Sequence, residues 1–250
     1  MPTDAPRLLA IDSSTDTLSV ALGSGVPDQP PLRFSGPGAA QSSATLLPAV
    51  QSLLAQAGWP LASLDAVVFG RGPGSFTGLR TACSVAQGLA YGAGGLPVLA
   101  VDTLLALAEA ARLQRRAQGL AVPACTLALL DARMDEIYVA LYASGDGAVQ
   151  AEPLQAPRLC APEALAPWLA GVLPAGAGPC LLAGNVFEVY ADRLAGLDGP
   201  RQPALPTAEA LLSLAPALLA AGRAVAAQDA LPLYVRDKVA RTTAEREGAR

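Results

Sequence analysis

The sequence predicts an α/β protein with two lobes, each of which opens with a hairpin of two strands. Three observations lead to this prediction. Short apolar runs alternate along the chain with segments of helical periodicity, which is the order that an α/β sheet requires. A pair of apolar strands around a polar turn occurs near the N-terminus and again about 120 residues later. Finally, 52% of the 250 residues are apolar, so a large core can be buried.

A polar turn between two apolar runs predicts the hairpin of the first lobe. Residues 7–12 are mostly apolar and end at an aspartate, residues 13–16 are all polar, and residues 18–22 alternate in part between apolar and polar side chains. A connection rich in proline and glycine follows over residues 23–38. The first lobe therefore begins with two paired strands, and residues 32–34 are a candidate third strand.

Two helices are predicted in the first lobe, because small or apolar residues recur there every three or four positions. The first covers residues 44–57 and ends at Gly58. A strand at 66–70 and a loop at 71–76 separate it from the second, which covers residues 77–91. The apolar faces contain Leu46, Leu47, Val50, Leu53 and Leu54 in the first helix and Leu79, Ala82, Cys83 and Ala86 in the second. Such a face either packs on the protein's own sheet or contacts a partner, and periodicity does not distinguish the two.

The rest of the chain continues the alternation of strands and helices. The predicted elements are a strand at 96–101, a helix from Asp102 or Thr103 to Arg116, strands at 126–130 and 137–142 around a turn at 131–136, a helix at 162–171, a strand at 181–184, a helix at 187–194 and a long helix from Pro206 or Thr207 to Gly222. We expect an N-terminal lobe with the partner-binding helices over residues 1–102, a C-terminal lobe over 103–204, a closing segment over 205–239 that packs back on the first lobe, and a tail over 240–250.

The composition excludes several classes of function. The chain has no histidine, which removes the Ser-His-Asp and Cys-His nucleophile systems and imidazole metal sites. Its one lysine, Lys238, does not follow a glycine-rich loop, so a Walker phosphate loop is absent. With 17 basic and 21 acidic residues the net charge is -4, which argues against strong binding of nucleic acid by this chain alone. We therefore expect neither a common hydrolase nor an enzyme whose metal is held by histidines.

Cysteine usage and apolar run lengths predict a reduced protein of the cytoplasm. The four cysteines, Cys83, Cys125, Cys160 and Cys180, form no Cys-x-x-Cys pair, and we expect them to pack as small apolar side chains. The N-terminus lacks the apolar core of a signal peptide, and no apolar run reaches the roughly 20 residues of a membrane helix. Membrane association is therefore not expected.

A glycine-rich segment between a predicted strand and a predicted helix is the strongest functional signal. Its residues are Gly72, Pro73, Gly74, Ser75, Phe76, Thr77, Gly78 and Arg80. Glycines let backbone N–H groups approach a ligand, and a helix N-terminus attracts anions, so a phosphate could bind here. The alternative is a tight turn in which Ser75 or Thr77 caps the helix, and the pattern favours it because Pro73 lacks an N–H donor and no lysine follows.

Two aspartates stand at the tips of the two predicted hairpins. Asp12, with Ser13 beside it, could hold a magnesium ion through water, or it could close an Asx turn, which the pattern favours. Asp131 occupies the equivalent place in the second hairpin. It could face the same cleft, or Arg133 could pair with a neighbouring carboxylate. Both interpretations of the second tip stay open.

Several motifs along the chain together resemble the bacterial TsaB (YeaZ) family. They are residues 9–15, the segment Gly72-Pro73-Gly74-Ser75-Phe76-Thr77-Gly78-Leu79-Arg80 with residues 86–90, residues 131–138, and Pro232-Leu233-Tyr234-Val235-Arg236. The glycine-rich segment is the specific one, whereas the first hairpin alone would be a weak signal. The resemblance spans residues 8–239 and implies two subdomains of the actin, Hsp70 and sugar-kinase (ASKHA) type, each begun by strand hairpins.

The resemblance also implies a role in making N6-threonylcarbamoyladenosine at position 37 of tRNAs that read codons beginning with adenine. It implies a non-catalytic subunit that forms a heterodimer with a catalytic, TsaD-like paralogue and works with a TsaE-like ATPase and a TsaC-like adenylate-forming enzyme. The partner face maps onto helices 44–57 and 77–91, and tRNA is reached through the complex. A homodimer stays open, as does ATP or ADP with magnesium at the partner interface.

One departure from the family and one alternative function stand beside this prediction. Gln41 occupies a position where family members commonly have a histidine, and glutamine hydrogen-bonds but does not titrate. The alternative is an independent ATP-binding ATPase or phosphotransferase that uses Asp12 and Asp131 to position magnesium, since a fold does not establish a function. We expect the accessory subunit rather than the enzyme.

Overall fold

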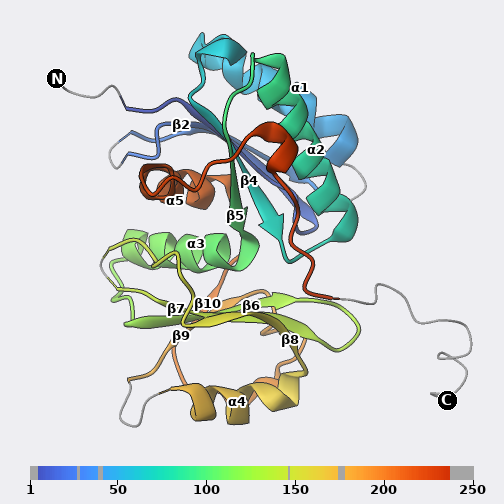
Figure 1. Ribbon diagram of the computed structural model, residues 1–250. Helices are drawn as coiled ribbons and strands as arrows, with labels where there is room; N and C mark the ends of the chain where they lie inside the picture. The colour runs from blue at the N-terminus through green and yellow to red at the C-terminus, as the bar shows by residue number, and fades with distance from the viewer. Residues whose placement is uncertain (1–4, 27–28, 39–41, 146, 174–177, 237–250) are drawn as a thin grey trace, which may run out of the picture.

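The chain forms two five-stranded sheets, one in each lobe (Figure 1). The computed structural model describes residues 5–26, 29–38, 42–145, 147–173 and 178–236. The predicted tail at 240–250 and Gln41 lie outside these residues. In strand order the first sheet contains β3 (Leu32–Pro37), β2 (Thr17–Gly23), β1 (Leu8–Asp12), β4 (Ala66–Gly72) and β5 (Val98–Asp102). The second contains β10 (Arg201–Pro203), β9 (Leu181–Gly184), β6 (Cys125–Asp131), β7 (Ile137–Ala143) and β8 (Gln155–Cys160).

Both sheets have the same arrangement of strands. In the first, β1 pairs antiparallel with β2 and β2 with β3, while β4 and β5 are added parallel on the other side of β1. In the second, β6, β7 and β8 are antiparallel in the same way, and β9 and β10 are added parallel beside β6. The prediction of an α/β protein in which a hairpin opens each lobe is confirmed.

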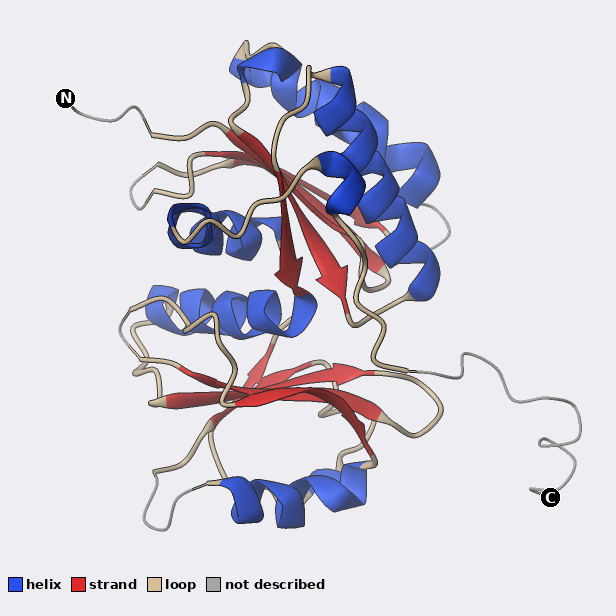
Figure 2. Cartoon of the chain, viewed as in Figure 1, coloured by secondary structure: helices blue, strands red, loops and turns tan. Residues whose placement is uncertain are grey.

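Five helices cover the faces of the two sheets in the described part of the chain (Figure 2). They are α1 (Ser42–Ala57), α2 (Phe76–Gly92), α3 (Thr103–Ala117), α4 (Leu165–Val172) and α5 (Ala208–Ala220). Helices α1 and α2 pack on the outer face of the first sheet, α4 packs on the outer face of the second, and α3 and α5 lie between the sheets. None of the described helices has the length and apolar character that crossing a membrane requires.

The alternation of side chains along β1 separates two of the three apolar cores. Leu8 and Ala10 point into the core between the sheets, while Leu9 and Ile11 point into the core beneath α1 and α2. This is the period of two that a strand imposes, and every one of these residues is fully buried. A continuous apolar run in the sequence therefore marks a central strand with helices on both faces.

Three predictions of secondary structure were wrong in the second lobe. Strands β8 and β10 were not predicted, because β8 is a half-exposed edge strand that contains Pro157 and β10 has only three residues. The helix predicted at 187–194 is a series of turns with a 3₁₀ segment at Asp192–Leu194. Tyr190 and Leu194 of this segment, and Val186 just before it, do pack on the second sheet at helical spacing, but the backbone does not form a continuous helix.

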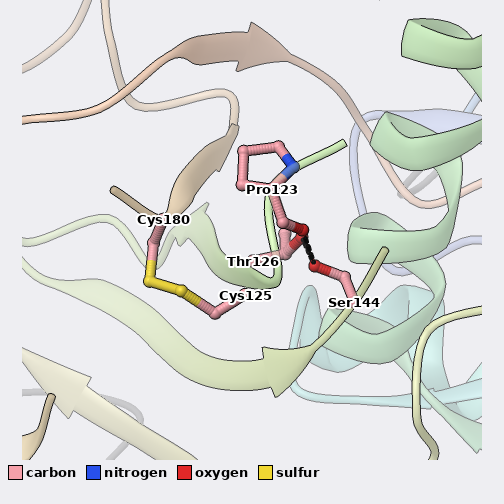
Figure 3. Close-up of a disulfide and its surroundings, with 5 residues drawn as sticks. All are labelled: Pro123, Cys125, Thr126, Ser144 and Cys180. Carbon is pink, nitrogen blue, oxygen red and sulfur yellow. Dashed lines mark hydrogen bonds between the residues drawn. A yellow bond between two sulfur atoms is a disulfide. The ribbon is translucent and has the colours of Figure 1, made fainter. Parts of the chain in front are cut away.

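A disulfide joins Cys125 and Cys180, which corrects the prediction that all four cysteines are reduced (Figure 3). The two residues precede Thr126 and Leu181, which pair in the parallel strands β6 and β9, and their Cα atoms lie 4.9 Å apart. A separation of 55 residues hides this proximity in the sequence. Cys83 and Cys160 are free and buried, as predicted.

A buried ion pair lies in the layer between the sheets. The Glu109 carboxylate accepts hydrogen bonds from Nε and Nη2 of Arg112, at 2.8 and 2.7 Å, and both residues are on α3. The carboxylate also accepts from the Ser213 hydroxyl of α5 at 2.6 Å and from the backbone N–H of Val149 at 3.2 Å. Because the carboxylate is fully buried, these donors replace water, and they connect α3 with α5 and with the loop after β7.

Replacing Glu109 by alanine should lower the free energy of unfolding by about 3–5 kcal/mol, because the Arg112 charge is then left buried without its partner. Urea denaturation measures this change. Arg223→Ala is the matched control: its ion pair with Glu152 has the same 2.7 Å separation but is exposed, so the loss should stay below about 1 kcal/mol. Equal losses in the two variants would contradict the prediction.

Candidate functional site

A cleft of about 340 Å³ lies where the tips of the two hairpins meet. Four segments line it, and they come from both lobes. They are the β1–β2 turn at 14–16, the β4–α2 loop at 73–76, the β6–β7 turn at 130–134, and the C-terminal segment at 233–236. The structure therefore brings together the glycine-rich segment and the second hairpin tip, which are more than 50 residues apart in the sequence.

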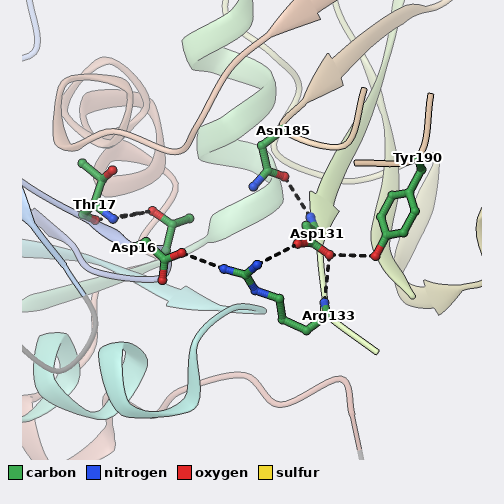
Figure 4. Close-up of polar contacts among 7 residues, drawn as sticks. Asp16, Thr17, Asp131, Arg133, Asn185 and Tyr190 are labelled. Carbon is green, nitrogen blue, oxygen red and sulfur yellow. Dashed lines mark hydrogen bonds and ion pairs between the residues drawn. The ribbon is translucent and has the colours of Figure 1, made fainter. Parts of the chain in front are cut away.

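An ion pair joins the two hairpin tips across this cleft (Figure 4). Nη2 of Arg133 lies 2.7 Å from Oδ2 of Asp16, and the two side chains are 71% and 75% exposed. Because water screens such a pair, its contribution to stability is at most about 1 kcal/mol. The pair marks the place where the lobes approach each other, but it is too weak to hold them together alone.

The Asp131 carboxylate is fully engaged by the protein (Figure 4). Its Oδ1 accepts hydrogen bonds from the Arg133 backbone N–H and the Tyr190 hydroxyl, both at 2.9 Å, and Oδ2 lies 3.4 Å from Nη1 of Arg133. Burial and the hydrogen bond to this carboxylate raise the pKa of Tyr190 to about 12, so the phenol remains a donor at neutral pH. Asn185 accepts from the backbone N–H of Asp131. Asp131 thus lines the cleft and also pairs with Arg133, so both interpretations of this hairpin tip hold.

Asp12 does not line the cleft, which corrects its predicted role as a possible magnesium ligand there. Its side chain is fully buried, and Oδ1 accepts from the Ser14 backbone N–H at 3.0 Å and from the Ser14 hydroxyl at 2.7 Å. This is the Asx turn that the pattern favoured. Oδ2 has no hydrogen-bond partner and lies against Gly70, where a Cβ atom would collide with it. Burial raises the pKa of Asp12 to about 6, partly offset by the Ser14 hydrogen bonds.

The glycine-rich segment makes close contacts with the first hairpin rather than leaving its donors free. Ser75 is the N-cap of α2, and its side chain accepts from the Gly78 N–H at 3.4 Å. The Ser75 N–H donates to the Ser14 carbonyl at 2.7 Å, and the Ser13 hydroxyl donates to the Gly78 carbonyl at 2.8 Å. A Cβ at Gly74 or Gly78 would collide with these serine carbonyls. The helix-cap interpretation is confirmed, and the glycines at 74 and 78 are explained by packing of the chain on itself.

Aromatic and cationic side chains gather at the mouth of the cleft: Phe76 and Arg80 were among the predicted site residues, whereas Tyr234 and Arg236 were not. The Phe76 and Tyr234 ring centres are 5.4 Å apart, the Arg80 guanidinium lies 3.8 Å from the Phe76 ring centre, and Arg80 Nε donates to the Tyr234 hydroxyl at 3.1 Å. Phe76 and Arg80 belong to the glycine-rich segment, and Thr77 is exposed beside them. Tyr234 and Arg236 belong to the last of the four motifs that resemble the family. That motif was the signal in the sequence that could have identified them as site residues.

Most of the residues predicted to contact a partner are buried in the chain's own core. Six of them, Leu46, Val50, Leu53, Ala82, Cys83 and Ala86, belong to the core between the two helices and the first sheet, and the buried Leu79 lines the cleft instead. Leu47 is 44% exposed, and Leu54 is half-buried. These residues are buried because helical periodicity identifies the apolar stripe of a helix, and in this protein that stripe faces the sheet. A partner on this side would contact the opposite face of the helices.

The described residues contain no group of three or more Cys, Asp or Glu side chains placed to hold a metal ion. Of the two aspartates considered as magnesium ligands, Asp12 is buried away from the cleft and Asp131 is occupied by Tyr190 and Arg133. The carboxylates at the hairpin tips therefore stabilise the turns of this protein.

The raised pKa of Asp12 predicts how stability depends on pH. The folded protein binds this proton more tightly than the unfolded chain, so the Asp12 contribution is full below pH 3.8 and is lost as the pH rises to about 6. Asp12→Asn removes the ionisation but keeps an oxygen acceptor for Ser14. At pH 7.5 the variant should therefore be about 2–3 kcal/mol more stable than the unchanged protein.

Urea denaturation at pH 4 and pH 7.5 measures this effect as the difference between the two proteins. The difference should grow with pH for Asp12→Asn and stay constant for Asp198→Asn, a control at an exposed position. A variant that is less stable than the unchanged protein at pH 7.5 would show instead that the Asp12 carboxylate is needed as an anion.

Comparisons with known proteins agree with the fold and the motifs. Residues 38–166 match the family described as TsaD, tRNA N6-adenosine threonylcarbamoyltransferase. The tRNA threonylcarbamoyladenosine biosynthesis protein TsaB of Escherichia coli K12 is 33% identical over 240 residues, which cover 94% of this chain and 96% of the relative. The TsaB protein of Haemophilus influenzae is 41% identical over 138 residues, or 52% of this chain and 51% of the relative.

A solved structure extends the similarity to three dimensions. YeaZ from Pseudomonas aeruginosa superimposes with a TM-score of 0.76 at 37% sequence identity, and the match covers 92% of this chain and 99% of that chain. The predicted resemblance is confirmed by sequence and by structure together, and the chain belongs to the TsaB (YeaZ) family.

Proposed function

We propose that this chain is a non-catalytic subunit in the biosynthesis of N6-threonylcarbamoyladenosine at position 37 of tRNAs that read codons beginning with adenine. It acts by forming a heterodimer with a TsaD-like catalytic paralogue. The relatives named TsaB are described as tRNA threonylcarbamoyladenosine biosynthesis proteins, and the matched family is that of the transferase itself. A TsaE-like ATPase and a TsaC-like adenylate-forming enzyme complete the pathway, which we place in the cytoplasm with its tRNA substrate.

The outer face of α2 is the observation that carries the proposed heterodimer. Residues Ser84, Gly88 and Tyr91 are exposed at helical spacing, and Tyr91 is 83% exposed. Gly88 lies within the helix, where glycine costs about 1 kcal/mol relative to alanine, and a Cβ there would meet no atom within 4 Å. Nothing within the described chain requires glycine at this position. A helix of a partner that approaches closely would require it.

The exposed side of α1 extends this surface. Helices α1 and α2 lie side by side on the outer face of the first sheet, and Leu47 and Gln51 are exposed on α1 (Figure 1). An exposed leucine and tyrosine beside a small residue offer apolar area and close approach together, which suits packing between helices of two proteins. We propose that the paralogue docks here, and that a homodimer would use the same face.

The state of the hairpin carboxylates supports a non-catalytic role. In a nucleotide-dependent enzyme with this arrangement, Asp12 and Asp131 would hold magnesium. Here Asp12 is buried against Gly70, and the Asp131 carboxylate accepts from Tyr190 and pairs with Arg133. Metal coordination by Oδ1 of Asp12 or by the Asp131 carboxylate would break hydrogen bonds inside the protein, and Oδ2 of Asp12 is buried against Gly70, so the local chemistry favours turn formation over metal binding.

Gly88→Arg should abolish the complex with the TsaD-like paralogue without unfolding the chain. The arginine side chain has open space around it in this chain, and arginine favours a helix over glycine, but it would occupy the surface needed for close approach. Co-elution of the two purified chains in size-exclusion chromatography measures binding, and threonylcarbamoylation of tRNA by the reconstituted complex measures function. Both should fall at least about tenfold, which corresponds to 1.4 kcal/mol of binding free energy.

Gly171→Arg in α4 is the matched control, because that glycine is also in a helix and also has no neighbouring atom within 4 Å of a Cβ. It should bind the paralogue and support modification at the unchanged level. Normal binding by Gly88→Arg would reject the proposed face, whereas normal tRNA modification in the absence of this chain would reject the proposed function.

The alternative function, an independent ATPase or phosphotransferase, draws support from the inter-lobe cleft, because both hairpin tips line it. Titration of the isolated chain with ATP and magnesium in a calorimeter tests it, together with a phosphate-release assay. We expect no saturable heat and no turnover, because the Asp131 carboxylate is engaged and Asp12 is buried away from the cleft. Turnover that is lost in Asp131→Asn would establish the enzyme instead of the accessory subunit.

A further inference from the structure

The last described residues, Leu231–Arg236, cross the mouth of the cleft and contact both lobes. We call this segment the strap. In Figure 1 it is the red trace that descends from beside α2 toward the second sheet. Strap residues Leu233, Tyr234, Val235 and Arg236 line the cleft. Movement of one lobe relative to the other would therefore change the contacts of the strap.

The first lobe holds the strap through its backbone and through one aromatic ring. The Leu233 N–H donates to the Arg71 carbonyl at 2.7 Å, and the Leu233 carbonyl lies so close to Gly72 that a Cβ there would collide with it. Tyr234 lies against Phe76 and accepts from Arg80. These contacts involve main-chain atoms and packed rings, so this end of the strap is the fixed end.

While Val235 packs against the core between the sheets, the polar contacts of the strap with the second lobe are made by Arg236. Its Nη2 lies 2.6 Å from Oε2 of Glu136 and 3.3 Å from the Arg133 carbonyl, and its guanidinium lies 6.0 Å from the Tyr138 ring centre. The Arg236 side chain is only 14% exposed. Partial burial makes this pair less screened by water than the exposed pair of Arg133 with Asp16, which is also at the cleft.

The turn that Arg236 holds has an unusual backbone. Arg133, Met134 and Asp135 have φ angles of 61°, 57° and 59°, so three successive residues with side chains adopt the left-handed conformation. Such residues are strained, and they keep this conformation only when their surroundings enforce it. The enforcing contacts come from three separate parts of the chain: Asp16 pairs with Arg133, Arg193 with Asp135, and Arg236 with Glu136.

We propose that the strap is a latch between the lobes. The Arg236–Glu136 pair holds the 133–135 turn in its strained conformation and keeps the mouth of the cleft closed. When Arg236 is released, the turn relaxes and the second hairpin tip withdraws from the mouth of the cleft, while the apolar layer between the sheets keeps the lobes joined. A two-state element of this kind allows a binding partner that competes for Arg236 or Glu136 to control access to the cleft.

Hydrogen exchange of the full chain, resolved by residue, tests the latch. Three amides report on it: Ala132 N–H donates to the Glu136 carbonyl, Glu136 N–H donates to the Arg133 carbonyl, and Leu233 N–H donates to the Arg71 carbonyl. In Arg236→Gln and in Glu136→Gln, the Ala132 and Glu136 amides should exchange about tenfold faster or more, whereas Leu233, at the fixed end of the strap, should keep its rate. The amide of Ile11 in the core strand β1 should be unchanged.

Two further variants separate the latch from a general loss of stability. The charge reversal Arg236→Glu with Glu136→Arg should restore slow exchange at both turn amides. Arg223→Gln breaks an ion pair of similar length away from the cleft and should change none of the three reporters. The latch is rejected if the turn amides keep their original rates in Arg236→Gln and Glu136→Gln, or if they accelerate only together with Ile11. If Arg236→Gln does not fold, the exchange rates of the turn amides in Glu136→Gln decide whether the latch is rejected.

Discussion

The apolar layer between the two sheets is the constraint on which the rest of this structure depends. Helices α3 and α5 fill that layer, and residues from β1, β4, β5, β6, β7 and β9 contribute to the same core. Both lobes bury side chains in it, so neither sheet can complete its inner face alone. Within this layer, the fully buried Glu109 carboxylate receives donors from α3, α5 and the loop after β7, and these directional bonds fix how the two helices sit against each other.

With the lobes joined through that layer, their hairpin tips can meet at one end. The first tip packs tightly against the glycine-rich loop, which is why Gly74 and Gly78 admit no side chain. The second tip carries the strained turn and reaches across to Asp16. The cleft between them is thus shaped by two turns of opposite character, one fixed by close backbone contacts and the other held by ion pairs that can exchange partners.

In this arrangement the carboxylates at the strand ends, Asp12 and Asp131, have a structural role. Asp12 closes a turn and Asp131 anchors the residues that follow it, so the groups that could have bound magnesium instead define the shape of the cleft. Under the proposed function, a chain that uses its hairpin carboxylates in this way supports another subunit through its surface. The exposed face of α2, with a glycine that its own fold does not require, is where such support would be given.

The sequence by itself determined the α/β class, the two hairpin starts, the α1 and α2 ranges to within about two residues and the family, and it favoured the Asx turn at Asp12 and a helix cap at Ser75 or Thr77. These depend on local periodicity, turn chemistry and ordered motifs, which act over a few residues. The sequence did not predict the edge strands β8 and β10 or the turns at 187–194, because short or interrupted elements carry little periodic signal.

Only the tertiary structure decided which apolar residues of α1 and α2 are available to a partner, that Cys125 lies opposite Cys180, and that Tyr190, Asn185 and Arg236 surround the second hairpin tip. Each of these depends on contacts between residues far apart in the chain. The physical reason is that burial and pairing belong to the packed arrangement of elements, whereas a stripe of leucines has the same spacing whether it faces a sheet, a partner or solvent.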